Sequence, residues 1–75
     1  MKTIKTETEL KEILTTLETT SDLQFQIEND VVTFSKNIYN EICLEIDMDS
    51  NDCILDSFDF IQEAYEALRE TYFGY

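Results

Sequence analysis

The sequence predicts a small α+β domain, in which a three-stranded antiparallel meander carries an N-terminal and a C-terminal helix on one face, in the order αβββα. Two observations predict this class. Apolar residues recur at intervals of three and four near both ends of the chain, and in the middle they alternate with polar residues. The 75 residues include no Pro and a single Gly, so no linker is indicated and we expect one domain over residues 1–75.

The first helix is predicted from about Glu7 to Thr19. Thr6, followed three residues later by Glu9, has the pattern of a capping box. Apolar residues then recur at the spacing of one helix face: Leu10, Ile13, Leu14 and Leu17.

Two strands and a tight turn are predicted next. In "LQFQIE" the apolar residues Leu23, Phe25 and Ile27 alternate with polar ones. A two-residue turn at Asn29-Asp30 would pair Ile27 with Val32 and Phe25 with Phe34. This register puts all four apolar residues on one face, which favours a β-hairpin.

A third strand is predicted in "EICLEIDMD", from Glu41 to Asp49. Four apolar residues would face the helices: Ile42, Leu44, Ile46 and Met48. The residues between them would face solvent, so we expect the other sheet face to be polar and acidic: Glu41, Cys43, Glu45, Asp47 and Asp49.

The second helix is predicted over Ile54 to Phe73. Its apolar residues alternate at intervals of three and four, as on one face of a helix: Phe58, Ile61, Tyr65, Leu68 and Tyr72.

The charge balance is strongly acidic, with 17 Asp and Glu against 5 Lys and Arg and a net charge of −12. Such a charge disfavours nucleic acid and anionic membranes as partners and favours a basic protein. With no His, no Gly-rich phosphate loop and no nucleophile beside an evident base, the sequence predicts no enzyme, no cofactor and no metal site. Cys43 and Cys53 are expected to be reduced thiols, and the short apolar runs favour a cytoplasmic protein.

The stretch "DSFDF" resembles the modification site of acyl and peptidyl carrier proteins. The resemblance implies that Ser57 receives a phosphopantetheine arm at the start of a helix. Carrier proteins are all-helical, however, and the residues before Ser57 alternate like strands. A helix cap formed by Asp56 or Ser57 is the favoured interpretation.

The stretch "DMDSND" invites comparison with a calcium-binding loop, because Asp47, Asp49 and Asn51 match its first, third and fifth ligand positions. Asp52 stands where such a loop needs Gly, and Phe58 stands where it needs a bidentate Glu. A solvated acidic turn is therefore favoured over a cation site.

The acidic residues concentrate in the C-terminal half, where Arg69 is the only basic residue between Glu41 and Glu70. On the predicted second helix they recur every three or four residues: Asp56, Asp59, Glu63, Glu66 and Glu70. Such steps place charges roughly 5–6 Å apart, comparable to the ~7 Å between successive phosphates of a nucleic-acid strand. We predict a partner-binding carboxylate surface composed of this stripe and four further acids: Glu41, Glu45, Asp47 and Asp49.

In size, acidity and element order the chain resembles small phage-encoded inhibitors that mimic nucleic acid, among them some anti-CRISPR and anti-restriction proteins. The resemblance implies a stoichiometric inhibitor whose carboxylates occupy the nucleic-acid groove of a nuclease or effector complex. An immunity protein or antitoxin that neutralises a basic toxin is the alternative, and a carrier-like protein modified at Ser57 is a third hypothesis. Either a monomer or a homodimer paired through an exposed strand edge is compatible with the sequence.

Aromatic residues gather near the end of the chain, at Tyr72, Phe73 and Tyr75. They could close the core or lie at the centre of an interface, and the sequence favours neither.

Overall fold

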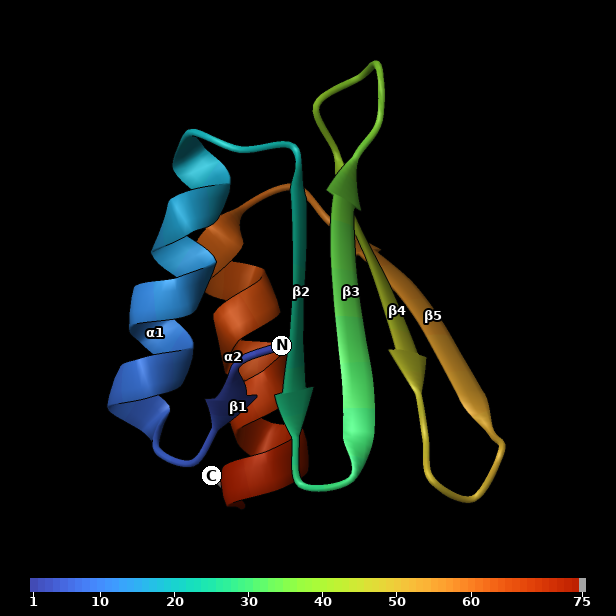
Figure 1. The fold of residues 1–75 in the computed structure, drawn as a ribbon. Helices are drawn as coiled ribbons and strands as arrows, with labels where there is room; N and C mark the ends of the chain where they lie inside the picture. The colour runs from blue at the N-terminus through green and yellow to red at the C-terminus, as the bar shows by residue number, and fades with distance from the viewer. Residues whose placement is uncertain (75) are drawn as a thin grey trace.

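The computed structural model describes residues 1–74, in which two helices cover one face of a five-stranded sheet (Figure 1). The elements follow one another as β1 (Thr3–Ile4), α1 (Glu7–Thr15), the 3₁₀ turn η1 (Thr16–Glu18), β2 (Asp22–Ile27), β3 (Asp30–Lys36), β4 (Ile42–Asp47), β5 (Cys53–Phe58) and α2 (Ile61–Phe73). The strands lie in the order β1-β2-β3-β4-β5; β1 runs parallel to β2, and the other neighbours are antiparallel. The α+β class is confirmed, and the predicted three-stranded meander is only part of the sheet.

The first helix begins where the sequence predicts. The Glu9 N–H donates to the Thr6 hydroxyl at 3.2 Å, and the Glu9 carboxylate accepts from the Lys5 N–H at 3.2 Å. The first bond satisfies one of the backbone donors that the first helical turn leaves unpaired, and the second ties Lys5, which precedes the N-cap Thr6, to the same turn. The α-helix ends at Thr15, earlier than predicted, and η1 continues it for three residues. Its apolar face is fully buried at Leu10, Leu14 and Leu17.

The first hairpin has the predicted faces but a different register. Ile27 pairs with Asp30 and Phe25 with Val32, so the turn lies at Glu28-Asn29, one residue earlier than predicted. The pairing therefore shifts by two residues, which returns every side chain to the same face because strand side chains alternate with a period of two. Four predicted core residues are accordingly buried: Phe25, Ile27, Val32 and Phe34.

The strand β4 confirms the third predicted strand. Its pairing with β3 places Leu44 beside Phe34 and Ile46 beside Val32. Ile42, Leu44 and Ile46 are buried beneath the helices, and Met48 packs against the same core.

The prediction of a single helix from Ile54 to Phe73 is wrong at its start. Residues Cys53–Phe58 form β5, which pairs with β4 along its whole length, and α2 begins at Ile61. Neither Asp56 nor Ser57 caps the helix, because the N-cap residue is Phe60, which makes no side-chain cap bond. Pairing with β4 satisfies the backbone N–H and C=O groups along one edge of β5. If residues 54–58 were helical, as predicted, β4 would be the edge strand of the sheet.

The strand β1 was not predicted. Thr3 and Ile4 pair in parallel with Gln26 and Ile27, and the Ile4 side chain is buried. The N-terminal residues thereby extend the sheet beyond β2, at the edge opposite β5 (Figure 1).

Candidate partner-binding surface

Two of the predicted binding residues, Glu45 and Asp47, lie on the sheet face that the helices leave open. They alternate with the buried residues of β4, and both are exposed. Cys53 stands opposite Asp47 on the same face. The structure therefore brings these two carboxylates together, as the alternation predicted.

Three others lie on the outer side of α2. Glu63, Glu66 and Glu70 are exposed, and their positions on the helix are opposite the buried residues Ala64, Tyr65 and Leu68. Since that buried side packs toward the sheet, these three carboxylates point away from it. The predicted continuous surface is thus wrong: the sheet and helix layers separate this group from Glu45 and Asp47.

The helical stripe is also shorter than predicted. Asp56 lies on β5 opposite Leu44, and Asp59 precedes the first residue of α2. Only three of the five stripe residues are therefore helical.

Glu41 lies apart from the other acids, in the loop between β3 and β4. Its carboxylate accepts from the Asn37 side-chain amide at 2.9 Å, and its N–H donates to the Asn37 carbonyl oxygen Oδ1 at 3.0 Å. This loop lies at the opposite end of β4 from Asp49. Glu41 orders its own loop, and nothing in the geometry joins it to the other carboxylates.

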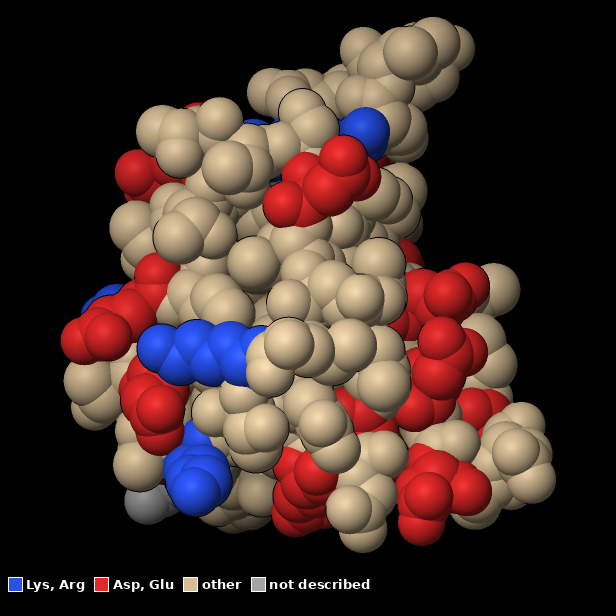
Figure 2. Space-filling view, in the orientation of Figure 1, with Lys and Arg blue, Asp and Glu red and all other residues tan. Residues whose placement is uncertain are grey.

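The remaining acids cluster around β4 and β5. We call this set the β4–β5 acidic edge: Glu45, Asp47, Asp49, Asp52 and Asp56. No Lys or Arg occurs in the sequence between Lys36 and Arg69. Figure 2 shows carboxylates with no basic residue among them on the side of the molecule where β4 and β5 lie, whereas carboxylates and basic residues lie together on the side of α1 and β1.

The acidic edge also carries two exposed apolar side chains, on opposite sides of β5, at positions that the sequence predicts to be helical. Ile54 is 39% and Leu55 is 72% exposed. Leu55 also lines a shallow pocket of about 220 Å³ on the open sheet face, together with Thr33, Ser35, Cys43, Leu44 and Glu45. An apolar centre within a charged rim is the usual arrangement of a protein interface.

The thiol of Cys53 is perturbed by its place on this edge. The surrounding sheet removes part of the water around the sulfur, and the Glu45 and Asp47 carboxylates add negative charge, so the pKa of Cys53 is raised. A raised pKa lowers the thiolate fraction and makes the thiol less reactive. Cys43 and Cys53 are both free.

Asp30 anchors the turn that carries part of the acidic edge, a role that sequence reasoning missed. Its buried side chain accepts from the Asp49 N–H at 3.1 Å and from the Tyr72 hydroxyl at 2.8 Å. The pKa of Tyr72 is raised by burial first, then by its hydrogen bond and proximity to Asp30 and by the charge of Glu28. We call these bonds the Asp30 clamp, because they tie the β4–β5 turn and the last turn of α2 to the start of β3.

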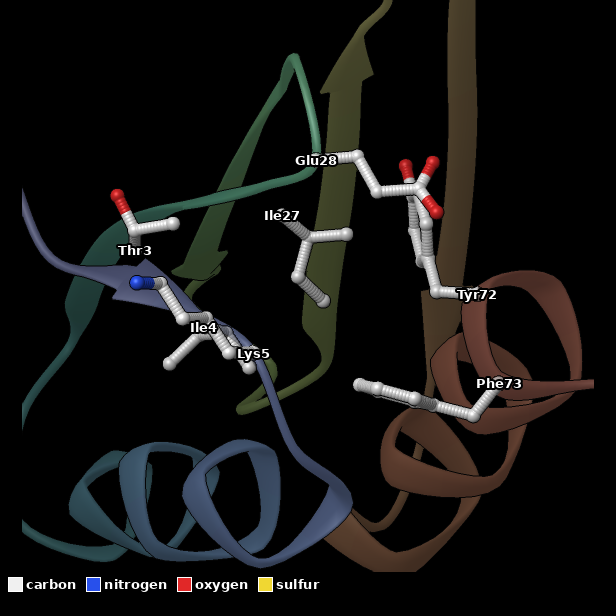
Figure 3. A pocket seen from close by; sticks show the side chains of 7 residues that line it. All are labelled: Thr3, Ile4, Lys5, Ile27, Glu28, Tyr72 and Phe73. Atoms are coloured by element: carbon white, nitrogen blue, oxygen red, sulfur yellow. The ribbon is translucent and has the colours of Figure 1, made fainter.

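A second hollow lies between β1, the β2–β3 turn and the end of α2 (Figure 3). Its volume is about 340 Å³, and it is lined by Thr3, Ile4, Lys5, Ile27, Glu28, Tyr72 and Phe73. Tyr72 and Phe73 also pack against the core, so they help to close it. Tyr75, the third aromatic residue of the predicted tail, lies outside the described residues.

The two short motifs adopt other geometries than those of the sites they resemble. Ser57 lies within the β4–β5 pairing, opposite Cys43 and one residue from the end of β5, and not at a helix start. Asp47 ends β4, while Asp49 and Asn51 belong to a tight turn in which Asn51 has a φ of 72°. Residues 1–74 contain no group of three or more His, Cys, Asp or Glu placed to hold a metal ion.

Comparison of the chain with protein-family models, with curated proteins and with solved structures finds no match. Neither helix in the described part of the chain has the length and apolar character needed to cross a membrane.

Proposed function

We propose that this chain is a small acidic inhibitor that binds a nucleic-acid-binding protein or nuclease and covers its nucleic-acid site, as the anti-CRISPR or anti-restriction type does. The observation that carries the proposal is the β4–β5 acidic edge, whose carboxylates lie beside exposed Ile54 on the helix side and exposed Leu55 on the open side of the sheet, with no Lys or Arg between Lys36 and Arg69 in the sequence. Basic residues of the partner would pair with the carboxylates, and its apolar atoms would cover Leu55.

The strand supports phosphate mimicry at short range. Alternate residues on one face of a strand lie about 6.8 Å apart, so Glu45 and Asp47 have close to the ~7 Å spacing of successive phosphates. The helical acids Glu63, Glu66 and Glu70 face another direction. We therefore assign binding to the sheet edge and assign to the helical acids only a contribution to the long-range field.

The same edge suits the alternative of an immunity protein or antitoxin that neutralises a basic toxin. The exposure of Ile54 and Leu55 favours this version, because a direct protein interface buries apolar side chains at its centre. The two versions share a surface and a partner chemistry and differ in the identity of the partner. Modification of Ser57 is not favoured, because its strand position lacks the helix start on which that hypothesis depended.

The test compares two variants that remove equal charge. The edge variant carries Asp47→Asn, Asp49→Asn and Asp56→Asn, and the helix variant carries Glu63→Gln, Glu66→Gln and Glu70→Gln. The wild-type protein is first used to capture a partner from a lysate of the organism that carries the gene, and the partner is eluted with DNA. The purified partner is then titrated with the wild type, the edge variant and the helix variant.

Three exposed charge pairs at about 0.5–1 kcal/mol each predict that the edge variant binds roughly 10–150-fold more weakly. The helix variant should stay within about threefold of wild type, apart from a slower association rate at low salt. Equal losses in both variants would place binding elsewhere. If DNA elutes no basic protein, or if captured protein binds equally well at low and high salt, the proposed function is wrong.

A further inference from the structure

We propose that the outer edge of β5 binds an extended basic segment of the partner, which adds to the sheet as a sixth strand. This inference rests on the proposed function and specifies how the partner is bound. It depends on the backbone of β5 and on the charges along it.

Among residues 1–74, no strand pairs with the outer edge of β5, which is six residues long. It is the last strand in the sheet order, and its pairing with β4 runs from Cys53 to Phe58. At the opposite edge of the sheet, the two residues of β1 pair with the Gln26–Ile27 end of β2. An unpaired strand edge presents N–H and C=O groups that can pair with another chain.

The hydrogen-bond pattern identifies which residues present those groups. At the turn, the Met48 N–H donates to the Asp52 carbonyl at 2.9 Å, so Met48 and Asp52 form a hydrogen-bonded pair. Such pairs alternate along antiparallel strands, so β5 directs backbone groups toward β4 at Ile54, Asp56 and Phe58. The residues between them direct their N–H and C=O groups outward: Cys53, Leu55 and Ser57.

Asp56 occupies one of these outward donors in the free protein. Its carboxylate accepts from the Ser57 N–H at 2.8 Å. A Lys or Arg beside Asp56 would draw the carboxylate toward itself and leave the Ser57 N–H for a carbonyl of the added strand. The outward groups of Leu55 and Cys53 would complete the ladder.

The side chains along β5 specify the added segment. On the helix side Asp56 lies between Ile54 and Phe58, which suits a Lys or Arg whose aliphatic stem covers the apolar neighbours. On the open side Leu55 lies between Cys53 and Ser57, which suits an apolar side chain. The expected segment therefore alternates basic and apolar residues.

Charge also decides between this segment and a second copy of the chain. Pairing of β5 with β5 of another copy would bring together two acidic edges and two proteins that each carry a net charge of −12. Like charges across a strand pair are destabilising, whereas the basic residues of the added segment are attracted to Asp56 and to the net negative charge of the chain.

The experiment uses an eight-residue peptide of alternating Lys and Val, blocked at both ends. Its matched control has the same sequence and charge but carries N-methyl groups on residues of both parities, so that neither of its edges can donate hydrogen bonds. Binding is measured by NMR titration of the full chain at low salt, and hydrogen exchange is measured for each β5 amide.

We expect the unmodified peptide to bind at least tenfold more tightly than the N-methylated one. Exchange of the Leu55 N–H should slow more than tenfold on binding, while the Ile54 N–H, already bonded to β4, should change little. Asp56→Ala should weaken binding of the unmodified peptide by roughly fivefold, and Asp59→Ala, an exposed acid outside the strand, should weaken it by less than twofold.

Equal binding of the two peptides, with no protection of Leu55, would show that charge alone attracts them. That result would overturn the added strand and leave the acidic inhibitor intact. Absence of any binding would also overturn it. Protection of Leu55 that rises with protein concentration, without peptide, would show instead that a second copy occupies the edge. Failure of the proposed function would appear separately, as the absence of a DNA-competed partner.

Discussion

Replacing Tyr72 by Phe tests the Asp30 clamp, because it removes one hydroxyl and little else. The hydroxyl donates to Asp30 at 2.8 Å, and the tyrosine is half-buried. A hydrogen bond to a charged group contributes about 1.5–3 kcal/mol, and partial exposure places this bond at the lower end. We expect the free energy of unfolding to fall by about 1.5 kcal/mol and Tm to fall by roughly 6–12 °C.

Urea unfolding followed by circular dichroism measures this loss, and the m-value should stay constant. Tyr39→Phe is the matched control, since the Tyr39 side chain is 76% exposed in the β3–β4 loop, and its effect should lie within about 0.5 kcal/mol of zero. In an Asp30→Asn background Tyr72→Phe should cost less than in wild type. In the single variant Tyr72→Phe, hydrogen exchange at the Asp49 N–H, which is the other donor to Asp30, should remain slow.

Two results would refute this reasoning. A loss no larger than that of Tyr39→Phe would show that the bond contributes nothing to stability. An equal loss in the wild-type and Asp30→Asn backgrounds would show that Tyr72 acts only through packing.

Three further predictions concern pH, a thiol and a helix cap. The pKa of Tyr72 is higher in the folded state than in the unfolded state, where it is about 10. The contribution of Tyr72 to the free energy of unfolding is therefore complete below about pH 10 and is lost as the pH rises toward the folded-state pKa. Above about pH 10 the free energy of unfolding should fall less steeply with pH in Tyr72→Phe than in wild type. With Cys43 replaced by Ser, Cys53 should react with a disulfide reagent at pH 8 more slowly than a free thiol does, and Asp47→Asn should raise that rate. Thr6→Ala removes the cap of α1 and should lower the free energy of unfolding by about 1 kcal/mol, measured by urea unfolding.

The elements that bury one face could be predicted from the sequence because burial imposes a period. The helix α1 and the strand β4 both carry apolar residues at the spacing of a single buried side; α1 begins at the predicted residue, and β4 lies within the predicted strand. For the first hairpin the same period fixed the faces but not the register. In the observed register Asp30 pairs with Ile27, and its side chain accepts hydrogen bonds from Asp49 and Tyr72. These partners are distant in the sequence, so the spacing of apolar residues could not indicate this register.

The strand β5 could not be recognised because it has no buried face. Five of its six residues are exposed. Its apolar residues therefore neither alternate with polar ones, as in a half-buried strand, nor form the continuous apolar run of a fully buried strand. Phe58 also lies three residues before Ile61, which extended the apparent helical spacing backward into the strand. Since the predicted carboxylate surface depended on that helix, its division between two faces follows from the same error.

The sheet order also bears on how the chain folds. Each antiparallel pairing joins strands that follow one another in the sequence, across the short turns after β2, β3 and β4. Short loops cost little entropy to close, and topologies dominated by local pairings fold quickly. Pairings between segments far apart in the sequence include β1 with β2, α1 with α2, and the bonds of Asp30 to Asp49 and Tyr72. The strand pairings of the meander therefore involve no residue of α2, whose packing completes the core and whose Tyr72 closes the clamp.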